Sequence, residues 1–281
     1  MQAASRDLGP QYALPFVVRV ERAAPPARTD ALEAAARAVL LFLSDPRVTG
    51  GARADGDGAD GEGTDGEGTD EEGTDGEGTD EEGADGESAA GEGTDREPAG
   101  GEWTDIVRAW QDARIRKVVR RARGAAWQRA LALPGITVAR RSAEVRVFPP
   151  VPVDDWPDDL AKLQVSGTDF TDPETPAEPA PGVPVLWLNP GLPMTAGKAM
   201  AQAGHGAQLA WWALRPRDRS AWRDLDFDLR VRTAAKEQWD ELLDSGLPVV
   251  TDGGFTEVAP GSATVVADHP ALRQATRRDG A

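Results

Sequence analysis

The sequence predicts an α/β protein in which one unit of strands and helices occurs twice. Apolar runs of strand length alternate with longer helical segments, which favours helices packed on a mixed sheet. Residues 109–131 also align with residues 221–243 without a gap, and eight of the 23 aligned positions are identical, including two tryptophan pairs. An acidic repeat interrupts the first unit. We therefore expect a three-layer α/β/α fold with a small mixed sheet, duplicated as a pseudo-dimer and interrupted by a disordered acidic insert.

The two units are expected to contain the same elements in the same order. A strand precedes a helix, and a second strand precedes a short helix. The segments are 16–20, 29–43, 115–120 and 124–132 in the first unit, and 185–188, 195–213, 227–232 and 234–244 in the second. A Gly/Pro turn then opens a hairpin, at 136–138 with 144–148 and at 248–251 with 256–258, and the second unit adds a strand at 263–267.

A second similarity places residues 15–20 on residues 184–188, at an offset of 169 instead of the offset of 112 found downstream. The difference of 57 is about the length of the acidic segment that lies between the two matches. Two diverged copies of one unit, the first enlarged by the insert, account for both offsets. Chance similarity in an Ala/Arg-rich chain is the alternative.

The net charge of −17 is concentrated in one segment, because residues 55–97 hold 19 Asp/Glu and one Arg, which leaves +1 for the rest. Residues 63–72 recur as 73–82 with almost no apolar side chain, so disorder is predicted for 49–100. The other expected parts are an α/β unit at 11–150, an acidic Pro-rich linker at 151–182 and a second unit at 183–281. Below, 11–150 is the N-terminal half and 183–281 the C-terminal half.

The composition excludes several classes of protein. The chain has no cysteine, which rules out disulfides, thiolate metal sites and a cysteine nucleophile, and its two histidines argue against a histidine-rich metal site. We therefore expect no metal and no cofactor. No apolar run approaches the roughly 20 residues of a membrane helix, and the first residues do not resemble a signal peptide. A cytoplasmic protein without membrane contact is the expectation.

The first candidate site lies on the predicted helix at 195–213. Thr195 is a suitable N-cap, and Lys198, Gln202 and His205 follow at i, i+4 and i+7, on one stripe of the helix. Lys198 falls in the first turn, where helix amides favour anions. A solvated helix face is the alternative. A phosphate loop is excluded, because Gly191 and Gly197 are separated by five residues and Ala199 follows the lysine.

The second candidate site begins at Asp252, which ends a predicted strand and enters a Gly-Gly turn. This end of an α/β sheet is where ligands usually bind, although Asp-Gly-Gly is also an ordinary turn. His269 has no such context and is expected to be structural.

Together the two segments resemble the type II peptidyl-tRNA hydrolase family over about residues 183–270. The family pattern Met-Gly-x-Gly-Lys-x-Ala-Ala-Gln-x-x-His-Ala is matched from Met194 to Ala207, and Asp-Ala-Gly-x-Thr-x-Ile-Ala-Pro-Gly-Ser-x-Thr-Val-Leu from Asp252 to Val266. The resemblance implies tRNA recycling in translation by hydrolysis of the ester in peptidyl-tRNA or N-substituted aminoacyl-tRNA. It also implies a site in which Lys198, His205, Asp252 and Thr256 are catalytic and Gln202 and Thr264 bind substrate.

Such a site could hydrolyse an ester by direct water attack, with Asp252 or His205 as proton acceptor and Lys198 near the developing oxyanion. Gly191 and Phe255 depart from the family pattern, because each replaces a charged residue. A catalytically weakened, tRNA-related binding or regulatory module is therefore the alternative function.

The N-terminal half lacks these groups. At the same offsets, Lys198, Gln202 and His205 fall on Thr29, Glu33 and Ala36, and Asp252 and Thr256 fall on Arg140 and Glu144. Enzymes of the resembling family form homodimers, so this half is expected to act as a packing partner in a pseudo-dimer within a monomeric chain. Five arginines are candidate tRNA contacts, with a solvated basic face as the alternative: Arg114, Arg116, Arg120, Arg121 and Arg123.

Overall fold

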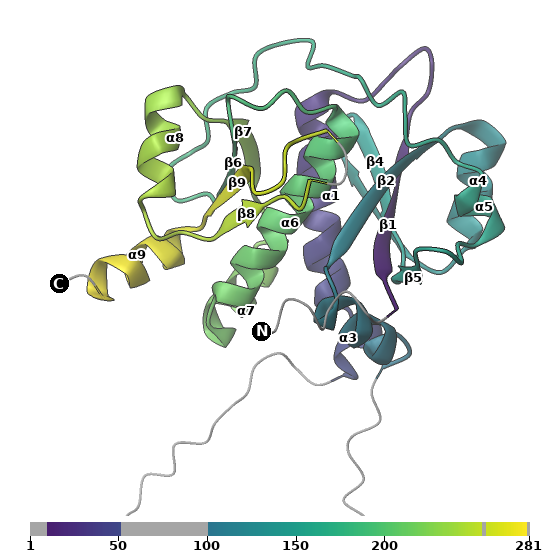
Figure 1. The fold of residues 1–281 in the computed structure, drawn as a ribbon, viewed down its shortest axis with the longest axis horizontal. Coiled ribbons are helices and arrows are strands. Elements are labelled where there is room, and N and C mark those ends of the chain that lie inside the picture. The colour runs from purple at the N-terminus through teal and green to yellow at the C-terminus, as the bar shows by residue number, and fades with distance from the viewer. Residues whose placement is uncertain (1–9, 52–100, 255–256, 280–281) are drawn as a thin grey trace, which may run out of the picture. The chain divides into compact units, whose positions relative to one another are not determined.

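The computed structural model describes residues 10–51, 101–254 and 257–279. The insert expected at 49–100 lies outside the described residues except for 49–51. The described chain forms two small mixed sheets flanked by helices, as the sequence predicts, and both sheets belong to one compact unit (Figure 1). No helix in this described part is both long and apolar enough to cross a membrane.

The first sheet is built from the N-terminal half, in the order β2-β1-β4-β3, with β5 paired to the start of β1. The strands are β1 (Tyr12–Arg19), β2 (Arg116–Ala122), β3 (Ile136–Arg140), β4 (Ala143–Val147) and β5 (Val151–Pro152). β1 is parallel to β2 and antiparallel to β4, so Phe16 lies between Val119 and Val147. The central strand β1 is apolar on both faces because helices cover both.

The second sheet has the same strand order and directions, β7-β6-β9-β8. Its strands are β6 (Val185–Leu188), β7 (Arg230–Thr233), β8 (Val249–Thr251) and β9 (Ala263–Asp268). β6 is parallel to β7 and antiparallel to β9, so Leu186 lies between Val231 and Ala267. The strands at equivalent positions in the two sheets are therefore β1 and β6, β2 and β7, β4 and β9, and β3 and β8.

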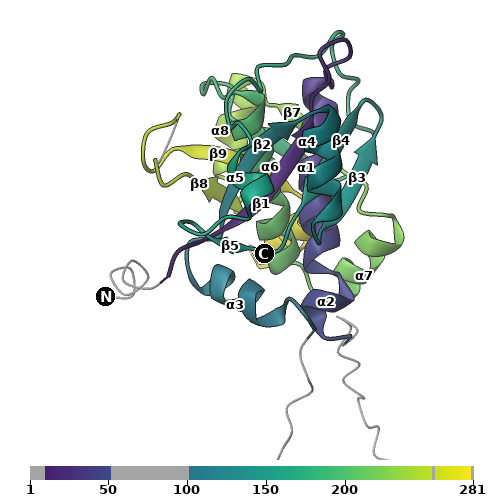
Figure 2. The ribbon, with the colours of Figure 1, turned by 90° about the vertical axis from the view of Figure 1, so that its right-hand side faces the viewer.

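Nine helices connect and cover the strands within the described residues: α1 (Arg28–Leu43), α2 (Pro46–Thr49), α3 (Thr104–Asp112), α4 (Gly124–Ala132), α5 (Asp158–Ala161), α6 (Ala196–Ala213), α7 (Pro216–Asp224), α8 (Lys236–Leu243) and α9 (Pro270–Asp279). α1 and α6 pack against each other between the two sheets, α1 mainly on β3 and β4, and α6 mainly on β9 and β2. Figures 1 and 2 show this central pair, with α4 and α5 beyond the first sheet and α8 beyond the second.

The small side chains of α1 and α6 allow this central packing. Both helices are rich in buried alanine, and one continuous apolar core includes residues of both sheets and both helices. Gly206 also serves close packing, because a Cβ there would lie 2.8 Å from Val265 Cγ1. A second core on the far side of the first sheet joins Val17, Trp127, Phe148 and Leu160.

Two strand predictions in the C-terminal half are wrong. The partner of β8 is β9, not residues 256–258: Glu257 and Val258 lie in the loop, and Thr256 is outside the described residues. The loop has turn signals at both ends, Gly253-Gly254 and Pro260-Gly261, so the sequence pattern predicts a shorter loop than the structure has. The strand expected from 227 begins only at Arg230, because Asp226 and Phe227 have φ of 55° and 53°, which a strand cannot accommodate.

The register also refines the comparison of the two halves. The pairing of Phe16 with Val119 and of Leu186 with Val231 sets β1 and β6 at an offset of 170 rather than 169. The linker expected at 151–182 includes β5, α5 and a bridge from Gln164 to Arg121, so its first part packs on the N-terminal half. Residues 165–182 contain no helix or strand.

Candidate active site

The helix α6 starts where the sequence predicts. Thr195 is its N-cap, and its Oγ1 accepts a hydrogen bond from Lys198 N at 3.2 Å. Two further groups satisfy the first amides: the Glu257 carboxylate accepts from Thr195 N at 2.8 Å, and Thr168 Oγ1 accepts from Gly197 N at 3.2 Å. The start of α6 is therefore fixed from two other segments of the chain, which sets the position of Lys198 one turn further on.

The loop after β8 fixes Asp252. Its backbone N donates to Ser262 O, and Gly261 N donates to its backbone O, both within 2.9 Å. Gly254 has a φ of +76°, and its N donates to Asp252 Oδ1 at 2.8 Å. A glycine suits this turn, since the left-handed conformation strains residues that carry a Cβ. Hydrogen bonds within its own loop therefore position the Asp252 carboxylate, in addition to its contacts with α6.

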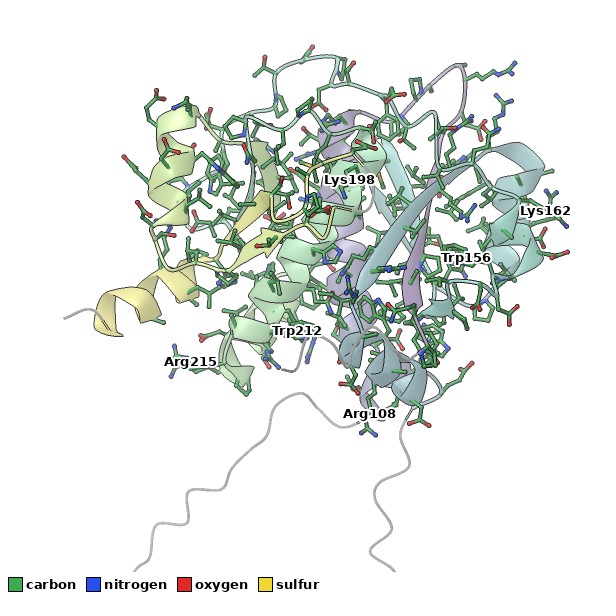
Figure 3. The ribbon with its side chains drawn as sticks, in the orientation of Figure 1. Arg108, Trp156, Lys162, Lys198, Trp212 and Arg215 are labelled. Carbon is green, nitrogen blue, oxygen red and sulfur yellow. The ribbon has the colours of Figure 1, made fainter. Side chains whose placement is uncertain are left out.

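Four side chains of the predicted site then form one hydrogen-bonded chain. Asp252 Oδ2 accepts from Lys198 Nζ at 2.6 Å and from Gln202 Nε2 at 2.7 Å. Gln202 Oε1 accepts from Thr264 Oγ1 on β9 at 2.6 Å. The structure thus brings Lys198, Gln202, Asp252 and Thr264 together from a helix, a loop and a strand. Figure 3 shows Lys198 near the N-terminal end of α6 and Trp212 near the other end.

Burial makes this cluster more than a surface ion pair. The side chains of Lys198 and Asp252 are only 11% and 8% exposed, and Gln202 and Thr264 are buried. A charge in such a place needs a partner, because its desolvation is costly when it stands alone. Lys198 and Asp252 neutralise each other here, and the two neutral residues satisfy the remaining hydrogen bonds.

His205 lies on the same stripe of α6, two turns beyond Lys198, and is half-buried. Burial lowers the pKa of His205 well below its ordinary value, and the positive charges of Lys117 and Lys198 lower it further. The imidazole is therefore neutral near pH 7. Lys117 comes from β2 in the N-terminal half, so both halves of the chain act on this histidine.

The structure does not place the other residues singled out in the sequence in this hydrogen-bonded cluster. Thr256 and Phe255 lie outside the described residues. Gly191 is exposed, and its N donates to Asn189 Oδ1 at 2.8 Å, so this turn is stabilised without the charge that the family pattern has there. His269 is structural, as expected: its ring packs edge-on against Trp222, and its Nδ1 accepts from Ala271 N at the start of α9.

The sequence did not point to Glu257, Thr168 or Lys117. Glu257 occupies a variable position between two motif residues, and Thr168 lies in the segment expected to be a linker. Lys117 is read as a solvent-facing strand residue in an arginine-rich stretch, and only the packing of α6 on β2 buries it. Within the described chain, no group of three or more His, Asp or Glu side chains is arranged to hold a metal ion.

Comparison with known protein families agrees with this geometry. The family described as peptidyl-tRNA hydrolase PTH2 matches residues 183–278. This segment therefore resembles that family, and we call it the PTH2 domain. It contains Lys198, Gln202, His205, Asp252 and Thr264, and it makes up the C-terminal third of the chain. No curated protein and no solved structure matches the chain.

The N-terminal half has a related cluster opposite the PTH2 domain, with the charges exchanged. Arg140, which the sequence alignment places on Asp252, lies 3.3 Å from Oε2 of Glu33, which that alignment places on Gln202. Glu33 is completely buried and also binds Arg232 of β7 in the PTH2 domain at 2.9 Å. The helix carries the carboxylate and the hairpin carries the cation here, whereas the PTH2 domain has the reverse.

The correspondence of Thr256 with Glu144 at a constant offset is wrong. Val138 faces Val145, and Val250 faces Val265, so β3 and β8 keep the offset of 112 while β4 and β9 are 120 apart. The hairpin of the PTH2 domain is thus longer, and Glu144 corresponds to Thr264 instead.

Proposed function

We propose that the PTH2 domain hydrolyses the ester bond of peptidyl-tRNA or N-substituted aminoacyl-tRNA, and so returns free tRNA to translation. The supporting observation is the buried Asp252 carboxylate that holds both Lys198 and Gln202, within a segment that matches the family. This arrangement holds the Lys198 ammonium, paired with Asp252, at the first turn of α6, where the helix amides favour an anionic substrate group.

The reaction proceeds by direct attack of water on the ester carbonyl. Lys198 stabilises the negative charge that develops on the carbonyl oxygen, and the resemblance to the family adds Thr256 as a further catalytic residue. The proton of the attacking water goes to Asp252 or to the neutral imidazole of His205. Gln202 and Thr264 bind the substrate end and keep the Lys198–Asp252 pair in place. We propose no covalent acyl-enzyme. The second histidine, His269, accepts a hydrogen bond at the start of α9 and so does not activate a nucleophile.

The tRNA is expected to contact both halves. We infer that the N-terminal half is a degenerate copy that completes a pseudo-dimer within one chain, which the equal strand orders and the Glu33–Arg140 contact support. Among its candidate tRNA contacts, Arg120 is the least suited, since it donates to the carbonyls of Ala161 and Leu163 and stacks on Trp156. Arg123 is exposed and remains the best candidate.

A deacylation assay tests the proposal. N-acetyl-aminoacyl-tRNA is incubated with the protein in the presence of a chelator, and released tRNA is measured. We expect turnover by the wild type, a loss of about 100-fold or more in Lys198→Met, and no change in Lys236→Met, whose side chain is 83% exposed on α8.

Absence of turnover above background, with tRNA still bound, would overturn the hydrolase and favour the weakened binding module. Gly191 and the closed Lys198–Asp252 pair are the observations that favour this second function. Hydrolysis that stops on adding chelator would overturn the metal-independent reaction alone.

A further inference from the structure

Lys117 is a buried cation without a carboxylate partner. It is 8% exposed on β2, and its Nζ donates to Gln208 Oε1 on α6 at 2.5 Å. Its other neighbours are the carbonyl of Ile115 and the indole of Trp110, whose ring centre is 4.9 Å from Nζ. Within the described residues, no Asp or Glu lies within salt-bridge distance of this amine. Burying a charge in this way is costly, and strongly perturbed groups cluster at functional sites.

The stem of Lys117 lies along the turn of α6 that carries His205. A Cβ at Gly204 would lie 3.2 Å from Lys117 Cδ and 3.0 Å from Val39 Cγ2. A glycine inside a helix costs about 1 kcal/mol relative to alanine, and this one provides the space that the lysine stem occupies. Gly204 precedes His205 and Gln208 follows one turn later, so the lysine contacts α6 just before and just after His205 in the sequence.

The other charges around His205 are compensated. Lys198 on α6 is neutralised by Asp252 at 2.6 Å. On α1, Arg37 is paired with Asp226, and Glu33 is paired with arginines of both halves. Of the two lysines whose charges lower the pKa of His205, only Lys117 has no ion-paired carboxylate among the described residues.

We propose that Lys117 is a positioning residue for His205, and that its uncompensated charge, supplied by the N-terminal half, holds the imidazole in its unprotonated form. The inference rests on the proposed function only in treating His205 as part of the reacting site. Burial lowers the pKa of Lys117 as well as that of His205. Because the two buried groups lie close together, a proton on the amine disfavours a proton on the imidazole.

The test is a histidine titration by NMR, which is simple because the chain has only two histidines. Protein labelled with ¹³C-histidine is titrated as wild type, Lys117→Met and Lys117→Arg. In Lys117→Met we expect the pKa of His205 to rise by at least one unit towards 6.5, whereas the charge-retaining Lys117→Arg keeps it low. His269 is the internal control, and its pKa of about 4 stays unchanged in all three proteins.

An unchanged His205 titration in folded Lys117→Met would overturn the proposal. If Lys117→Met does not fold, Gly204→Ala is titrated instead. The added Cβ displaces the lysine side chain, so the pKa of His205 should rise partially. An unchanged pKa in Gly204→Ala would then overturn the inference.

The activity readout separates this inference from the proposed function. If the pKa of His205 in Lys117→Met returns to 6.5, only about one imidazole in eleven is neutral at pH 5.5, so kcat should fall about tenfold there and recover at pH 8. KM should change little. A chain that never hydrolyses the ester would refute the function, while the NMR titration would still decide the role of Lys117.

Discussion

A double-mutant cycle on Lys198 and Asp252 measures how strongly the candidate site is held together. The side chains are 11% and 8% exposed and 2.6 Å apart, so either single substitution, Lys198→Met or Asp252→Asn, leaves a buried charge without its partner. Losing one member of a buried pair costs about 3 to 5 kcal/mol. We take the lower end, about 3 kcal/mol, because both groups keep some contact with water.

The double variant removes both charges and should recover much of this loss, which gives a coupling energy of about 2 kcal/mol. The free energy of unfolding is measured by urea denaturation at pH 7, and each single variant should also melt roughly 6 to 12 °C lower. The matched control is the exposed pair Lys236–Asp240 on α8, 3.9 Å apart, where no measurable coupling is expected. Additive effects at Lys198 and Asp252 would refute the buried, mutually neutralised pair. Asp252→Asn should therefore destabilise the fold, whereas His205→Ala, which breaks no ion pair, should leave stability nearly unchanged.

Two further predictions concern pH and the acidic segment. Burial lowers the pKa of His269 to about 4 from 6.5, so its contribution is complete above pH 6.5 and is lost as the pH falls, by roughly 3 kcal/mol at pH 4. His269→Asn, which can still cap α9, should flatten the fall in stability between pH 7 and pH 4, and an equal fall in both proteins would contradict this. Deletion of residues 55–97 should leave the melting temperature unchanged and tRNA binding at low salt at least as tight, because Trp103 N already donates to Arg47 O at 2.7 Å and joins the flanks of the insert. Loss of folding, or a lower single-turnover rate, would show that the segment is structural.

Much of the fold follows from local signals in the sequence. The helix predicted at 124–132 has those bounds, and the Thr195 N-cap gave the start of α6. The Trp110–Trp222 alignment connects α3 with α7, and the Trp127–Trp239 alignment connects α4 with α8. These signals are local because capping and helical periodicity depend on residues within one or two turns.

The features of the fold and the site that the sequence does not predict depend on contacts between residues distant in the sequence. Residues 256–258 are predicted as the partner of β8 because two turn signals bracket the loop. The partner is instead β9, which is predicted as an additional strand at 263–267 and pairs with both β6 and β8. Lys117 could not be predicted as buried, since a lysine on a strand reads as solvent-facing until α6 covers it. Of the candidate site, the motif placed Lys198, Gln202, Asp252 and Thr264 correctly in one cluster, whereas the Glu257 and Thr168 contacts at the start of α6 come from loops without periodicity.

The central pair α1 and α6 has a consequence for how such a chain can evolve. In a dimer of identical subunits, every substitution at the two-fold interface appears twice, so a cation placed on one side must also be tolerated on the other. In the pseudo-dimer that we propose, the two facing helices are encoded separately. One side can therefore carry Glu33 with Arg140 while the other carries Gln202 with Asp252, and a single buried amine can approach α6 without a symmetric twin. Covalent linkage in such a pseudo-dimer would allow each side of the interface to change independently of the other.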